Sequence, residues 1–160
     1  MTVLEIVDES YSGKWERMRT ACRGLVLENG LILLSYETSS GLWMIPGGGL
    51  EPGEDELSCC VREVSEETGV LIRPSPCAVE LNEYFGTLKH VNRYFPGTVI
   101  GQVERNLTER ERLAGMEPRW IPAEEALAVF AQYETSADMH RMRRALYKRE
   151  YTALREYLRE

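Results

Sequence analysis

The sequence lacks long apolar runs: stretches such as Leu31–Leu34 are only a few residues long, far short of the roughly 20 that a membrane-spanning helix needs. The N-terminus has neither the basic start nor the apolar stretch of a secretion signal, so we expect a cytoplasmic protein with no membrane partner. Only four of 160 residues are cysteines, and none has C-x-x-C spacing, which argues against a zinc or thioredoxin-type site. The adjacent Cys59 and Cys60 are expected to be reduced helix residues.

Several motifs of catalytic and binding proteins are also missing. The chain contains no G-x-x-x-x-G-K-[ST] loop, no G-x-S-x-G turn and no calcium-binding D-x-D-x-D-G loop, which excludes the corresponding site classes. Positive charge is scarce as well, with 19 Lys and Arg against 26 Asp and Glu and a net charge of −7. Such a balance disfavours non-specific binding to nucleic acid, so a small-molecule partner is expected.

What is present indicates a folded globular protein. Hydrophobic residues make up 43% and charged residues 28%, and no repeat or linker divides the chain, so we expect a single domain over residues 1–160. Asn29-Gly30 predicts a hairpin turn, and Gly69 stands where a helix C-cap is expected. The expected elements are strands over residues 19–28, 31–36, 77–85, 90–102 and 119–121, and helices over residues 54–68, 122–130 and about 138–159. This order predicts a sheet covered by helices.

The last predicted helix is amphipathic. Tyr147, Tyr151, Leu154 and Leu158 recur at helical spacing and are expected to pack on the core. Residues 138–160 contain seven Lys or Arg and four acids, a local excess of three positive charges. A solvated face is the commoner explanation for such a run, although it keeps an RNA-binding role open.

The predicted helix over residues 54–68 has two contrasting faces. An apolar stripe is formed by Leu57, Cys60, Val61, Val64 and Thr68. Glu63, Glu66 and Glu67, spaced i, i+3 and i+4, project from another side, so all three are expected to be solvent-exposed. Their mutual repulsion calls for a neutralising cation. Arg62 could pair with Glu66, but one arginine cannot offset three acids. Mg²⁺, which prefers oxygen ligands, fits this need.

Three consecutive glycines, Gly47, Gly48 and Gly49, precede this helix. Glycine-rich loops allow close backbone approach and present N–H groups to phosphate. A phosphate-binding loop beside carboxylates that hold a metal indicates attack on a phosphorus centre.

Residues 48–70 resemble the Nudix box, G-x5-E-x7-R-E-U-x-E-E-x-G-U, in which U is a bulky aliphatic residue. Val64 and Val70 fill the two aliphatic positions. The seven fixed positions are filled by Gly48, Glu54, Arg62, Glu63, Glu66, Glu67 and Gly69. The resemblance to this MutT-like hydrolase family implies an α/β/α sandwich with a central mixed sheet and a loop–helix–loop catalytic motif. It also implies hydrolysis of a nucleoside diphosphate linked to another group, with Mg²⁺ or Mn²⁺ as the cofactor.

The resemblance further implies roles for individual residues. Glu63 and Glu67 correspond to metal ligands, with Glu66 as a third and the Gly48 carbonyl as a further oxygen donor. Arg62 would orient these glutamates by ion pairing. Many relatives take one more acidic ligand from a loop before the last strand, and the candidates here are Glu109, Glu111 and Glu117, with Glu111 favoured.

The substrate is not fixed by the box. Gly47, Gly48 and Gly49 are expected to bind phosphate, while Trp43 and Tyr84 are candidates for stacking on a base. His90 is a candidate for a phosphate contact. The leading hypothesis is an enzyme acting on a modified nucleoside triphosphate or another nucleoside diphosphate derivative. The alternatives are an RNA 5′-end pyrophosphohydrolase and a non-catalytic nucleotide sensor, and a homodimer stays open as the assembly.

Overall fold

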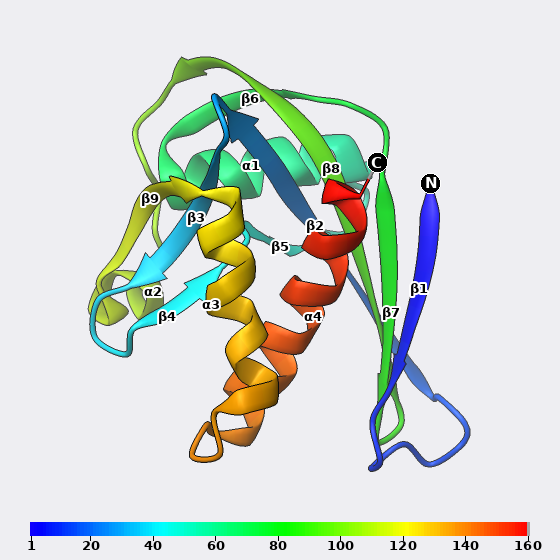
Figure 1. Cartoon of the computed structure of the whole chain (residues 1–160). Coiled ribbons are helices and arrows are strands. Elements are labelled where there is room, and N and C mark those ends of the chain that lie inside the picture. The colour runs from blue at the N-terminus through cyan, green and yellow to red at the C-terminus, as the bar shows by residue number, and fades with distance from the viewer. Residues whose placement is uncertain (160) are drawn as a thin grey trace.

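The computed structural model describes residues 1–159 and shows a nine-stranded sheet between helices (Figure 1). The helices are α1 (Glu56–Thr68), α2 (Glu109–Ala114), α3 (Ala123–Thr135) and α4 (Arg141–Leu158). The strands are β1 (Thr2–Val7), β2 (Arg17–Glu28), β3 (Leu31–Glu37), β4 (Leu42–Met44), β5 (Gly47–Gly49), β6 (Val70–Pro74), β7 (Val79–Phe85), β8 (Leu88–Gln102) and β9 (Met116–Pro122).

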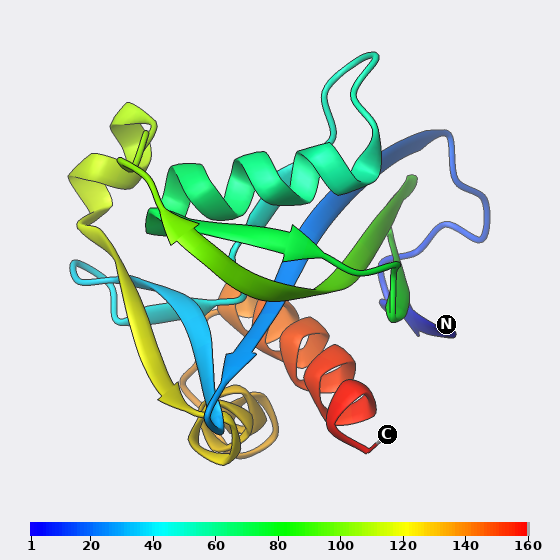
Figure 2. The same ribbon diagram turned by 90° about the horizontal axis from the view of Figure 1, so that it is seen from above.

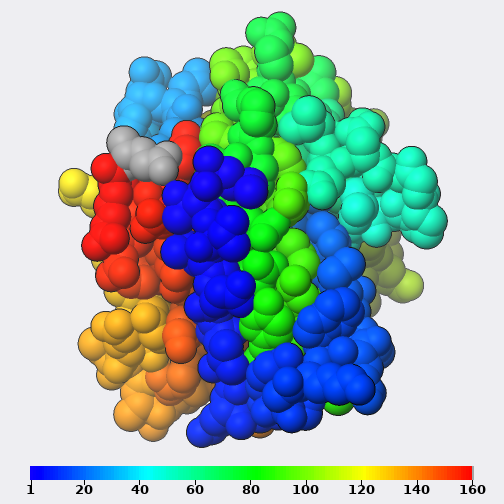
Figure 3. Space-filling model, turned by 90° about the vertical axis from the view of Figure 1, so that its right-hand side faces the viewer, coloured from blue at the N-terminus to red at the C-terminus, as the bar shows by residue number. Residues whose placement is uncertain are grey.

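The sheet is mixed. Its strand order is β1-β7-β8-β2-β3-β4, with β5 paired to β2, β6 to β8 and β9 to β3. The pairs β1–β7 and β2–β8 are parallel, and the other pairs are antiparallel. The first strand lies along the edge beside β7, as Figure 3 shows in dark blue and green.

Helices cover both faces of the sheet, as predicted. Seen from above, α1 lies on one side and α3 and α4 lie on the other (Figure 2). Each face has its own core of buried side chains. The α1 side contains Cys22, Val26, Cys60, Val64 and Phe95, and the α4 side contains Leu25, Tyr94, Phe130, Tyr147 and Leu154. Strand β2 contributes side chains to both cores, and residues 47–49 pair with it. No helix in the described part of the chain is long and apolar enough to cross a membrane.

Most predicted elements form, with shifted boundaries. Asn29 and Gly30 adopt φ values of 54° and 79°, the two positive φ angles that a type I′ hairpin turn requires. The predicted helix over 54–68 begins at Glu56 because the Asp55 side chain accepts a hydrogen bond from Ser58 N and caps it. The last helix begins at Arg141, three residues later than expected, with His140 as its N-cap.

Other elements were not predicted. The sequence pattern did not predict strands β1, β4, β5 and β6 or helix α2. Strands β1 and β6 depend on partners distant in the sequence, and the other three elements are short. Helix α2 has six residues and depends on a capping box, in which Thr108 Oγ1 accepts from Glu111 N and Glu111 Oε1 accepts from Thr108 N.

Two packing expectations were wrong. Leu57 is 41% exposed, whereas Cys60 and Val64 of the same predicted stripe are buried. The charged run of α4 is not wholly solvated, because Arg149 is 8% exposed and Glu150 is fully buried. Glu150 accepts hydrogen bonds from Ile45 N at 2.7 Å and Tyr94 OH at 2.7 Å, so it joins α4 to the sheet.

Candidate active site

The acidic helix α1 is held at both ends by local interactions. Asp55 caps its start with bonds from Ser58 N at 2.8 Å and Ser58 Oγ at 2.9 Å. Gly69 ends it with a left-handed φ of 76°, and its N–H donates to Ser65 O at 2.9 Å. The helix is therefore fixed with its acidic residues beside β5.

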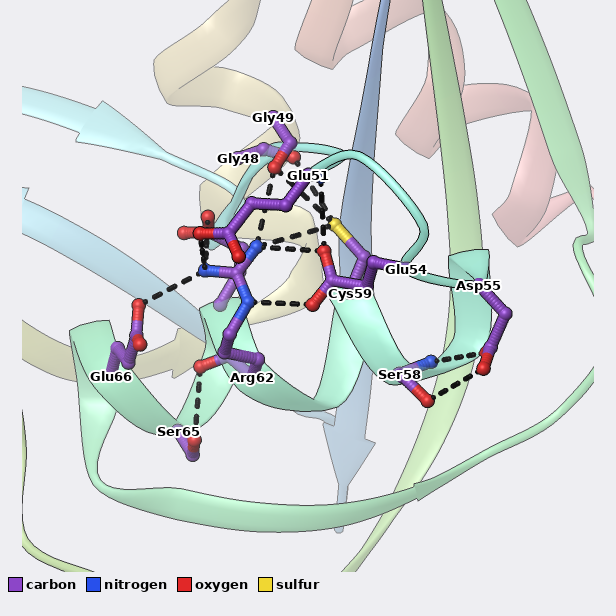
Figure 4. A network of polar contacts seen from close by, with 11 residues as sticks. Gly48, Gly49, Glu51, Glu54, Asp55, Ser58, Cys59, Arg62, Ser65 and Glu66 are labelled. Carbon is purple, nitrogen blue, oxygen red and sulfur yellow. Dashed lines mark hydrogen bonds and ion pairs between the residues drawn. The ribbon is translucent and has the colours of Figure 1, made fainter.

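Arg62 lies at the centre of the polar contacts on this helix (Figure 4). Its guanidinium binds Glu54 through two hydrogen bonds, Nε to Oε2 at 2.7 Å and Nη2 to Oε1 at 3.0 Å. Nη1 reaches Glu63 at 3.0 Å and Glu66 at 3.2 Å, and Nη2 reaches Gly49 O at 3.3 Å. Arg62 holds the pKa of Glu54 at about 2. Arg62 thus contacts three glutamates, and its orienting role stays a prediction.

Glu67 is not exposed, contrary to the expectation from helix periodicity. Its side chain points under the glycine loop and is only 7% exposed. It accepts a hydrogen bond from Ser35 Oγ at 3.2 Å and one from Gly47 N at 3.1 Å. Burial raises its pKa to about 8, and the charges of Glu111 and Glu63 act in the same direction. Ser35 comes from β3, a strand distant in the sequence, so helix periodicity could not show this contact.

The remaining acids surround this buried carboxyl group. Burial raises the pKa of Glu63, and Arg62 opposes that change. Glu111 is close enough for its charge to raise the pKa of both Glu63 and Glu67, although its carboxylate also caps α2. The other two candidates for an additional ligand fit less well, because Glu109 is exposed and Glu117 pairs with Arg119 at 2.7 Å.

The three glycines form a short strand rather than an open loop. Residues 47–49 pair with residues 21–23 of β2, Gly48 opposite Cys22. A Cβ atom at Gly48 would lie 2.5 Å from the Glu63 carboxylate, and one at Gly47 would lie 2.4 Å from Cys22 O. Only glycine therefore allows the backbone to approach the acidic side chains this closely.

Most polar atoms at this site are oxygen donors, but in this arrangement they do not form a complete metal-coordination site. Within residues 1–159, no three His, Cys, Asp or Glu side chains converge closely enough to hold a metal ion. The contacts explain this spacing: Arg62 binds Glu63 and Glu66, whereas Glu67 is turned toward Ser35 and Gly47. The donor types and the Gly48 approach fit a hard divalent cation, with carboxylate rotation needed to complete its coordination.

The two aromatic candidates lie in different places. Trp43 is on β4, where it packs against the core on the α4 side with its ring 4.4 Å from that of Tyr36. Tyr84 is on β7, where its ring packs 5.3 Å from that of Tyr11. Strands β8 and β2 separate β7 from β5, a distance on the order of 14 Å across the sheet. Trp43 is thus close to the glycine strand along the chain but has its side chain in the α4-side core, and Tyr84 is distant from the glycine strand.

Two contacts of the site were not predicted. Ser35 binds the carboxylate of Glu67, and Cys59 Sγ donates to Gly48 O at 3.7 Å and Gly49 O at 3.6 Å. The sequence offered one signal for the first contact: Ser35 is a polar residue that directly follows the apolar run Leu31–Leu34. Cys59 and Cys60 are free, as expected, and Cys22 and Cys77 are free as well.

A cavity of about 380 Å³ borders the C-terminal end of α1. Thr68, Arg105 and Trp120 are among its lining residues, and the box acids are not. The acids instead face the glycine strand, so this cavity is separate from the proposed metal ligands.

Fold and site together define a mixed sheet between helices, with a cluster of glutamates that contact Arg62 beside a glycine strand. The NUDIX domain profile matches residues 18–144, and the chain belongs to that family. Members of the family generally use divalent metal ions.

Individual relatives agree with this assignment. The chain is 41% identical over 108 residues to an RNA pyrophosphohydrolase of Erythrobacter litoralis, covering 64% of this chain and 58% of that protein. It is 32% identical over 99 residues to a MutT-like protein of Streptomyces ambofaciens, covering 59% and 60%. The chain thus spans less than two thirds of the length of these curated relatives. The MutT protein of Methanosarcina mazei has the same fold, with a TM-score of 0.59 and 22% identity over 91% of this chain and 98% of that one.

Proposed function

We propose that this chain hydrolyses a diphosphate bond in a nucleoside diphosphate linked to another group, such as a modified nucleoside triphosphate. One observation carries the proposal. Glu67 is a buried carboxylate that has only neutral hydrogen-bond donors, while Glu63 and Glu111 add negative charge near it. Such a group is unstable as an anion unless a cation joins it.

Glu63, Glu66, Glu67 and the Gly48 carbonyl would hold the cation, with Glu111 as an additional ligand. Their oxygen atoms match the preference of Mg²⁺ or Mn²⁺. The bound ion supplies charge neutralisation on the diphosphate and a lowered pKa for the attacking water.

The protein groups have distinct tasks in this proposal. Arg62 keeps Glu63 and Glu66 oriented through bonds of 3.0 and 3.2 Å. Gly47, Gly48 and Gly49 give the substrate phosphates access to the backbone. Trp43 is left out of this arrangement because its side chain packs in the α4-side core, and Tyr84 because of its distance from β5.

A second candidate function is RNA 5′-end pyrophosphohydrolysis. It is supported by the match to the Erythrobacter litoralis relative, which carries that name. The net charge of −7 weighs against it. We place the enzyme in the cytoplasm and expect a monomer or homodimer, which light scattering on the purified protein would distinguish.

A phosphate-release panel tests the proposal. It compares canonical and oxidised nucleoside triphosphates, ADP-ribose, nucleotide sugars, dinucleoside polyphosphates and 5′-triphosphate RNA, each with Mg²⁺, Mn²⁺ or EDTA. We expect metal-dependent cleavage of one small-nucleotide class. Cleavage of the RNA alone would favour the second candidate. Silence from folded, metal-loaded protein would overturn catalysis and favour a nucleotide sensor.

A further inference from the structure

Two neighbouring cavities open on the surface beyond the C-terminal end of α1. The lining of the first includes Gln102, Arg105 and Trp120, and the lining of the second includes Arg105, Asn106 and Arg112. Each has a volume of about 380 Å³, which is in the range of small-molecule sites. Because Arg105 lines both cavities, they adjoin, and we call them together the Arg105 site.

The segment that carries these residues is fixed to the rest of the fold. It joins β8 to α2, and Figure 2 shows α2 and β9 beside the end of α1. Asn106 N donates to Glu66 O on α1 at 2.8 Å, and Arg105 Nη1 donates to Met116 O on β9 at 2.7 Å. The backbone of the segment and the guanidinium of Arg105 are therefore positioned before a ligand arrives, which lowers the cost of binding.

The Arg105 site is positively charged, although the chain has a net charge of −7. Arg105 and Arg112 both line it, and none of the lining residues is acidic. Neither arginine forms an ion pair with an acid of residues 1–159. Two guanidinium groups next to each other, without carboxylate partners, favour an anionic ligand.

Trp120 provides an apolar plane in the same site. It lies on β9, where it pairs with Leu33 of the α1-side core, and it is 37% exposed. Within the described residues its ring stacks on no other aromatic ring. A flat heterocycle can therefore stack on the open face of the indole. The side-chain amide of Gln102 lines the same cavity and can donate to or accept from the edge of such a ring.

We propose that the Arg105 site binds a free nucleoside monophosphate. Its base stacks on Trp120, and its phosphate lies between Arg105 and Arg112. An aromatic plane in one cavity and two cations in the adjoining one match a ligand with a flat ring at one end and a phosphate at the other. The box acids do not line either cavity, so this inference goes beyond the proposed hydrolysis and does not depend on it.

Ligands with only one of the two features satisfy the site less well. Inorganic phosphate pairs with the arginines but leaves the indole of Trp120 in water. A nucleoside covers the indole but leaves both guanidinium groups without an anion. A diphosphate that carries a divalent cation brings positive charge of its own, which Arg105 and Arg112 repel.

Calorimetric titration of the unaltered protein in EDTA tests the site without a metal ion. We expect AMP to bind at least about tenfold more tightly than adenosine, ribose 5-phosphate or inorganic phosphate. Arg112→Met and Trp120→Leu should each weaken AMP binding about tenfold. The matched control is Arg110→Met, which changes an arginine of the same helix that approaches Glu37 instead, and it should leave the affinity within about twofold.

Three results would overturn the proposal. They are AMP binding no tighter than that of its parts, AMP binding that neither Arg112→Met nor Trp120→Leu weakens, and no binding up to millimolar AMP.

A measurement on the unaltered protein protects the test against a variant that fails to fold. The chain has three tryptophans, and in assigned ¹⁵N–¹H spectra AMP should shift the indole signal of Trp120 while those of Trp15 and Trp43 stay in place. An unmoved Trp120 signal at saturating AMP contradicts the proposal. If AMP binds here but the phosphate-release panel is silent, the proposed hydrolysis fails and the Arg105 site stands.

Discussion

Two buried glutamates on opposite faces of one sheet have very different surroundings. Glu150 on α4 is fully buried and accepts from Ile45 N, Tyr94 OH and Arg149 Nε at 2.7, 2.7 and 3.0 Å. Glu67 on α1 is 7% exposed and accepts only from a serine hydroxyl and a backbone N–H. A carboxylate with a cation and full hydrogen bonding stabilises the fold, whereas one without a cation is available for a ligand.

The strongest test of this contrast is Glu67→Gln. The amide keeps the size of the side chain but removes the charge that a metal ion needs, so we expect activity to fall by at least about 100-fold. The fold should persist, because the carboxyl group is already easily protonated. Metal-dependent phosphate release and circular dichroism measure the two effects. Exposed Glu124→Gln is the control, and full activity of the Glu67 variant would exclude its role as a ligand.

The corresponding change on the other face, Glu150→Gln, should act on stability instead. It leaves the buried guanidinium of Arg149 without its nearest acid, which should lower the free energy of unfolding by about 3 kcal/mol. Urea denaturation measures this loss. Glu156→Gln on the same helix removes a pair with the exposed Arg159 at 3.6 Å, so it should cost less than about 0.5 kcal/mol. Equal effects of the two changes would contradict the structural role of Glu150.

Stability against pH should reveal Glu67 directly. Its pKa is raised from 4.5 to about 8, so above pH 4.5 the unfolded chain releases this proton while the folded chain retains it. Stability without metal should therefore fall as pH rises, by about 2 kcal/mol between pH 6 and pH 8 from this group. The difference between wild type and Glu67→Gln in chemical denaturation isolates the effect. Mg²⁺ should reduce it, and a flat difference with pH would refute the raised pKa.

Glu111→Gln should have a smaller effect. Glutamine can still accept from Thr108 N and cap α2, so the change removes charge and little else. We expect the apparent affinity for Mg²⁺ to fall about tenfold, measured by activity against metal concentration. Thr108→Ala is the matched control: it removes half of the capping box and should cost about 1 kcal/mol without changing the metal affinity. A metal response unaffected by Glu111→Gln would exclude it as a ligand.

The sequence predicted the acidic helix well because its signals are local. Gly69 ends the helix through its own φ, and the i,i+4 spacing brings Arg62 to Glu66 whatever lies around them. The capping box of Thr108 and Glu111 is equally local, and its pattern was present in the sequence although α2 was not predicted. The boundaries of α1 and α4 shifted by a few residues because a capping side chain decides the first turn.

Burial was harder to predict, because it depends on strands distant in the sequence. Glu67 is buried because Ser35 lies 32 residues earlier on β3. Glu150 is buried because Tyr94 lies 56 residues away on β8. Helix periodicity places both glutamates on a face but does not say what packs against that face.

The sequence by itself determined the acidic helix, its glycine approach and the family to which they belong, since these follow from spacing along a single segment. The tertiary structure decided which acids lose water, because strands from separate parts of the chain cover one side of each helix. It also decided that Arg23 contacts Asn92, since the parallel pairing of β2 with β8 places these two residues on neighbouring strands.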